Sequence, residues 1–174
     1  MKHKLKKAAL AGAIALAMAI PASATTFDAD ALDKFVETAS ACIIGQVTNI
    51  EHEQRGSFVV TMATVQVSRT AFGSTASEIK VMIPGGPIPN SKIPVAVTVA
   101  GAPQLNVGQN FMLVLNDAQN ANEYTVAGLS EGAIAVVNTA DGPQVSLPNS
   151  QGRMTLDSAI EGINTLRDGE AGLE

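Results

Sequence analysis

His52 is the residue best suited to acid–base chemistry, and it lies between two carboxylates, Glu51 and Glu53. A histidine can transfer a proton or bind a metal ion, and a carboxylate beside it can orient the ring. Side chains alternate along a β-strand, however, so Glu51 and Glu53 point to one face and His52 to the other. We therefore interpret these residues as a solvated strand end and predict no catalytic residue there.

Metal-ligating residues are sparse in this sequence. A zinc site needs several His or Cys ligands, and residues 25–174 hold one of each, His52 and Cys42. Asp28, Asp30 and Asp33 could supply oxygen ligands to calcium, but the glycine and the final glutamate of an EF-hand loop are missing. These acids fit the start of a helix better. We predict no metal ion and no cofactor.

Cys42 has no partner with which to form an intramolecular disulfide, because it is the chain's single cysteine. It lies in the apolar run 41–44. We interpret it as a small buried hydrophobe, and the alternative is a reactive or dimer-forming thiol.

The first 24 residues have the pattern of a secretory signal peptide. Lysines come first, an apolar segment spans 8–20, and the stretch ends in Ala22-Ser23-Ala24. The apolar segment is shorter than the roughly 20 residues that span a bilayer, so we predict no stable membrane insertion. We expect cleavage between Ala24 and Thr25, and export to the periplasm or the extracellular medium.

Charge and composition exclude several kinds of partner. Four of the eleven Lys and Arg lie in the leader, so seven remain against sixteen Asp and Glu, a formal charge of −9. Such a chain repels nucleic acid and anionic membrane surfaces. With no Trp and one Tyr, Tyr124, it also lacks the aromatic platforms that stack on sugars.

The hydrophobic pattern predicts a helix followed by strands. Leu32, Phe35, Val36 and Ala39 recur at helical spacing. β-branched and alternating residues then predict strands at 42–47, 57–71, 79–83, 95–99, 123–128 and 133–137, and the continuous apolar run 111–115 predicts a strand buried on both faces. Thr155 is placed to cap a closing helix.

Short strands with Gly and Pro turns favour a mainly β domain. We expect a small, partly open antiparallel barrel with one helix near each end, and a two-sheet β-sandwich is the alternative. No repeat or linker divides residues 25–174, so we predict one domain after the leader, with its core at about 32–166.

Residues 84–94 are rich in proline and glycine, and we expect a long loop there. Long ordered loops on a rigid barrel often carry binding surfaces. This loop is therefore our candidate for contact with a partner, and a plain connection across the barrel end is the alternative. The candidate residues are Pro84, Gly85, Gly86, Pro87, Ile88, Pro89 and Asn90.

An ordered series of short motifs resembles a group of secreted bacterial proteins of unassigned function. The motifs lie at 44–47, 72–73, 83–86, 99–103, 107–115 and 124–128. Those proteins are similar to the OB-like barrel of netrin-like domains and of the tissue inhibitors of metalloproteinases. The resemblance implies an OB-like barrel and a partner that is another exported protein, a metalloprotease among the candidates.

One departure from those inhibitors matters. Their mature N-terminal residue is a disulfide-bonded cysteine that reaches the protease zinc, whereas the expected first residue here is Thr25 and Cys42 is interior. The zinc-chelating mechanism therefore has no counterpart in this sequence. Our leading hypothesis is a non-catalytic secreted binding or accessory module. The alternatives are a self-associating structural or surface component and an enzyme with an unrecognised site.

Overall fold

A computed structural model describes residues 31–147 and 152–170. The predicted leader, its cleavage point at Ala24 and Thr25, and the acids Asp28 and Asp30 lie outside the described residues. Within these ranges, no helix is long and apolar enough to cross a membrane.

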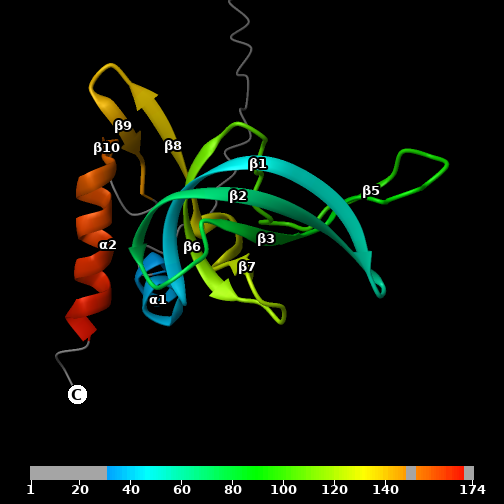
Figure 1. Ribbon diagram of the computed structural model, residues 1–174, viewed down its shortest axis with the longest axis horizontal. Coiled ribbons are helices and arrows are strands. Elements are labelled where there is room, and N and C mark those ends of the chain that lie inside the picture. The colour runs from blue at the N-terminus through cyan, green and yellow to red at the C-terminus, as the bar shows by residue number, and fades with distance from the viewer. Residues whose placement is uncertain (1–30, 148–151, 171–174) are drawn as a thin grey trace, which may run out of the picture.

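The elements follow one another in the order shown in Figure 1. They are α1 (Ala31–Thr38), β1 (Ala41–Arg55), β2 (Phe58–Phe72), β3 (Glu78–Pro84), β4 (Gly86–Pro87), β5 (Ala96–Val97), β6 (Asn110–Asp117), β7 (Glu123–Val126), the 3₁₀ turn η1 (Leu129–Gly132), β8 (Ala133–Thr139), β9 (Gly142–Val145), β10 (Met154–Thr155) and α2 (Leu156–Glu170).

Five of the strands close into a barrel. The hydrogen-bonded order is β1-β2-β3-β7-β6, and β6 pairs again with β1 to complete the ring. The β3–β7 pair is parallel, and every other pair in the ring is antiparallel. This is the small, partly open OB-like barrel that the sequence predicted, rather than a sandwich.

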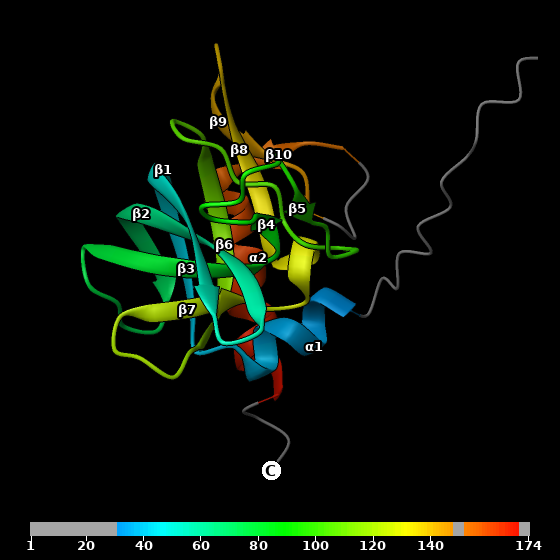
Figure 2. The ribbon, with the colours of Figure 1, turned by 90° about the vertical axis from the view of Figure 1, so that its right-hand side faces the viewer.

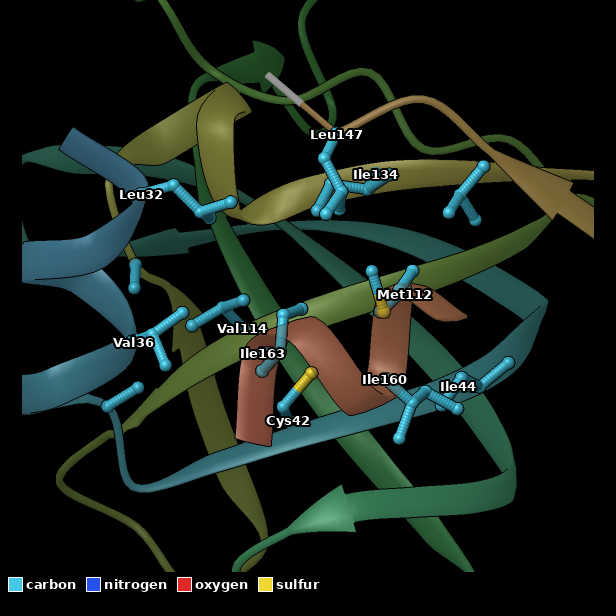
Figure 3. Close-up of a cluster of buried hydrophobic side chains, with 14 residues drawn as sticks. Leu32, Val36, Cys42, Ile44, Met112, Val114, Ile134, Leu147, Ile160 and Ile163 are labelled. Atoms are coloured by element: carbon cyan, nitrogen blue, oxygen red, sulfur yellow. The ribbon is translucent and has the colours of Figure 1, made fainter. Parts of the chain in front are cut away.

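Two apolar layers hold this barrel together, and β1 and β6 contribute to both. Ile43 and Leu113 point into the barrel, whereas Cys42 and Met112 point outward to the helices. Figure 3 shows the outer layer, where Cys42 lies near Ile163 of α2. β6 is buried on both faces, as its continuous apolar run predicted.

Polar contacts fix α2 against the outer layer. The Thr155 hydroxyl accepts a hydrogen bond from the Ser158 N–H at 3.2 Å, so Thr155 is the predicted cap. At the other end, Arg167 donates to the Ala39 carbonyl at 3.0 Å and lies 4.1 Å from the centre of the Phe72 ring. Through Arg167, α2 thus contacts both the chain just after α1 and the end of β2.

The structure corrects two details of the predicted strands. Residues 84–94 are not entirely loop, because Gly86 and Pro87 pair with Val97 and Ala96. A two-residue ladder tolerates Pro87 because Ala96 sits opposite it at a position without a direct hydrogen bond. Strands β9 and β10 were not predicted, since they are short and lack an apolar alternation.

We expect Cys42 to be inert in the folded protein. Its side chain is fully buried, and burial raises the pKa of its thiol to about 12. A thiol-specific chromogenic reagent should therefore label no cysteine in native protein at pH 8 and one per chain in denaturant. Rapid labelling without denaturant would show that the outer apolar layer opens readily.

Replacing Ile163 with alanine should destabilise the whole domain, because this side chain is fully buried between α2 and the barrel. We expect a loss of about 2–5 kcal/mol in the free energy of unfolding, measured by denaturant titration. Thr165→Ala, on the exposed side of the same helix, is the matched control and should cost less than about 1 kcal/mol. Equal effects would show that α2 is not part of the core.

Candidate functional site

The predicted partner-binding loop forms most of a projecting arm. We define the arm as residues 86–99, which contain β4, β5 and the loop between them; it extends away from the barrel in Figure 1. Every residue from Ser91 to Gly101 is exposed. Of the candidate residues, Gly86, Pro87, Ile88, Pro89 and Asn90 belong to the arm, while Pro84 and Gly85 lie at its base.

A short hydrogen-bond chain supports the base of the arm. The Thr61 hydroxyl donates to the Gly85 carbonyl at 2.8 Å, and His52 Nδ1 lies 3.0 Å from the same hydroxyl. Because the Thr61 hydroxyl donates its one proton to Gly85, it can only accept a hydrogen bond from His52. We therefore assign a proton to His52 Nδ1. Gly86, with φ at 128°, packs so closely on Thr61 that a side chain there would collide with it.

His52 is therefore a supporting residue in this structure. As the alternation predicted, it faces away from Glu53, which contacts Arg55 on the other face of β1. It lines a pocket of about 250 Å³ between the barrel and the arm, and the other lining residues bring no carboxylate. Among the described residues, no three His, Cys, Asp or Glu side chains gather to hold a metal ion.

An apolar depression, which we call the outer groove, adjoins this pocket and shares Pro84, Val97 and Val99 with it. Three adjoining hollows of about 330, 310 and 540 Å³ share Met82, and two of them share Val60 and Pro84. Its apolar lining comes from the barrel, the arm, the segment that follows the arm, and η1: Phe58, Val59, Val60, Met82, Pro84, Val97, Val99, Pro103, Val126 and Leu129.

Four apolar side chains that line the outer groove are exposed, whereas Val60 and Pro103 are buried and Met82 and Pro84 are half-buried. Phe58 keeps 73% of its surface accessible and Leu129 keeps 42%, and Val97 and Val99 are also exposed. Isolated apolar residues on a surface are ordinary, whereas a contiguous set marks a site of interaction.

An ion-pair cluster forms one wall of the groove. Arg55, at the end of β1, donates through Nη1 and Nη2 to both carboxylate oxygens of Glu123 on β7, at 2.8 and 2.9 Å. Its Nε donates to Glu53 at 2.7 Å, and Nη1 also lies 3.8 Å from the Met82 sulfur. The guanidinium thus crosses from the tip of the β1–β2 hairpin to the β6–β7 turn.

This geometry changes the titration of Glu123, whose side chain is 12% exposed. The hydrogen bonds from Arg55, with a further one from Asn120 at 2.8 Å, lower the pKa of Glu123 from 4.5 to about 2. The same pairing raises the pKa of Arg55. Both groups therefore stay charged at any physiological pH, and they serve as a rigid clamp rather than as a proton donor or acceptor.

Sequence reasoning missed the outer groove, although part of its signal was present. The alternation along residues 57–71 puts Val59, Thr61 and Ala63 on one face of the strand and therefore Phe58 and Val60 on the other. Apolar residues at successive outward positions of a strand are a sign of a second buried or binding surface. The partnership of Arg55 with Glu123 had no such signal, because 68 residues separate them.

The comparisons with known proteins supply no assignment. No protein-family model matches the chain, and no curated protein matches it. The resemblance to netrin-like domains stays a prediction.

The Arg55–Glu123 clamp should make the free energy of unfolding depend on pH in the acidic range. Because the pKa of Glu123 is lower in the folded protein, its contribution is complete above about pH 4.5 and is lost as the pH falls toward about 2. Glu123→Gln should cost about 1 kcal/mol at pH 7, since Arg55 is one third exposed and water screens the pair. The difference between wild type and variant should shrink from pH 5 to pH 2 in denaturant titrations. A constant difference over that range would contradict the role of the clamp.

Proposed function

We propose that this protein is a non-catalytic, exported binding module that attaches to another exported protein through the outer groove. The observation that carries this proposal is the exposure of Phe58, Val97, Val99 and Leu129 around adjoining apolar hollows on an acidic chain. Apolar side chains that are exposed to water have a free-energy cost, and their burial against a partner removes that cost.

The composition of the groove favours a protein partner. Phe58 is its single aromatic side chain, and the charge of Arg55 is matched by Glu53 and Glu123. Nucleic acid requires free cations and stacking platforms, and sugars require aromatic faces. Valine, proline, methionine and leucine side chains instead complement the apolar side chains of another polypeptide.

The proposal includes export of the protein and a class of partner. The charged, apolar and small-residue segments of the first 24 residues support export to the periplasm or the medium. An exported metalloprotease is the partner class that the resemblance to netrin-like domains suggests. With Cys42 buried and Thr25 as the expected first residue, such a partner would be bound without a cysteine at its zinc.

Phe58→Asp should abolish partner binding. The substitution puts a charge into the hollow that Phe58 lines with Val60 and Val97, at a side chain that is already 73% exposed, so we expect the fold to survive. Tagged protein beginning at Thr25 is used to recover proteins from the periplasmic and secreted fractions, and mass spectrometry quantifies them. We expect at least about a tenfold loss of the specific partner, equivalent to about 1.4 kcal/mol.

Val137→Asp is the matched control. Val137 is 41% exposed and lies on β8, outside the groove, so this variant should recover the partner as wild type does. Protease assays on the recovered material, with and without a metal chelator, test for a metalloprotease. Equal recovery by Phe58→Asp and wild type would place the binding surface elsewhere, and no specific recovery by wild type would overturn the proposed function.

A further inference from the structure

One edge of β5, in the arm, has no neighbouring strand among the described residues. β5 pairs with β4 alone, through Val97 with Gly86 and Ala96 with Pro87. Pro87 has no N–H, so its pair with Ala96 is the non-hydrogen-bonded kind and the N–H and C=O of Val97 face β4. The corresponding groups of Ala96 and of Thr98, on either side of Val97, therefore point away from β4.

The side chains on this edge continue the apolar lining of the outer groove. Val95, Val97 and Val99 alternate with Ala96 and Thr98, and all five are exposed. Val97 and Val99 line the same hollow as Phe58 and Pro84. A strand placed beside β5 would gain backbone hydrogen bonds from the edge, and its alternate side chains would enter the groove.

The surroundings of the groove are acidic. Asp117 lines the hollow beside Arg55, and Glu131 follows Leu129 in η1. The one cation in the lining, Arg55, is bound by Glu53 and Glu123, and Lys80 lies opposite Glu123 in the β3–β7 pair. The negative charge that would attract a basic segment therefore comes from the chain as a whole, which has sixteen Asp and Glu against seven Lys and Arg after the leader. An incoming segment with Lys or Arg near its ends would be attracted, and an acidic segment would be repelled.

We propose that β5 receives an extended segment of the partner as an added strand, in which apolar and polar residues alternate and basic residues flank the apolar ones. This inference rests on the proposed function and specifies how the partner binds. A second copy of the chain fits less well, because each copy carries a formal charge of −9 after the leader.

The test uses a fluorescent synthetic peptide, Lys-Val-Thr-Val-Thr-Val-Lys, as the probe. Fluorescence anisotropy measures its affinity for the protein beginning at Thr25, and hydrogen exchange by NMR measures protection of the Ala96 and Thr98 amides. We expect saturable binding with protection of both amides. A peptide with glutamate ends loses the charge attraction, and a peptide with alternate backbone nitrogens methylated loses hydrogen bonds to the edge. Each should bind at least about tenfold more weakly.

Thr98→Pro is the decisive variant, since it removes an outward N–H without touching the pair between Val97 and Gly86. It should weaken the peptide at least about tenfold. Thr98→Val keeps the N–H and should bind as wild type does, and thermal unfolding of both variants establishes that the fold is intact. Full binding by a folded Thr98→Pro protein would overturn strand addition.

The outcomes separate this inference from the proposed function. If Phe58→Asp loses the natural partner while Thr98→Pro retains it, the groove binds the partner and strand addition is wrong. If neither substitution affects recovery of the partner, both proposals are wrong. A concentration-dependent dimer in sedimentation that Thr98→Pro abolishes would make a second copy the occupant and would also overturn the inference.

Discussion

The fold depends on the burial of both faces of the first five residues of β1, the strand that pairs with β6 to complete the ring. β1 pairs with β2 along its length and with β6 over its first residues, and its alternation sends Ile43 inward and Cys42 outward. Inward residues need the barrel interior, and outward residues need α1 and α2. Neither layer is complete without the other, so the barrel and its helices are expected to fold as one cooperative unit.

The length of β1 and β2 also creates the surface on which we place function. Both strands run for 15 residues, well beyond the segment where β6 covers β1. They curve strongly in Figure 1, and the Arg55–Glu123 clamp ties the tip of this hairpin to β7. The clamp lies over Met82 and leaves the outer faces of β2 and β3 open toward the arm. The long β1–β2 hairpin and its Arg55–Glu123 clamp therefore both stabilise the barrel and leave the groove exposed.

In Figure 2, β4 and β5 of the arm lie above α1 in the view, to the right of the barrel strands β1, β2 and β3. Gly85 and Gly86 allow the chain to leave β3 and pair with β5, since both adopt positive φ values, 90° and 128°. The support from Thr61 and His52 connects the arm to the barrel wall. The arm is thus held by specific contacts at its base while its outer strand stays accessible.

The sequence alone was sufficient for the local structure and for the class of fold. The helical spacing of Leu32 and Val36, the alternation along β2 and the apolar run of β6 each report on side chains a few residues apart, and those local periodicities reflect one buried face. The prediction of a loop at 84–94 also followed from the proline and glycine content, although Gly86 and Pro87 form the short strand β4 within it. The tertiary structure alone decided the pairing of Arg55 with Glu123 and the continuity of the outer groove. Both join residues that are distant in the chain, and their proximity depends on strand order and curvature, which periodicity does not encode.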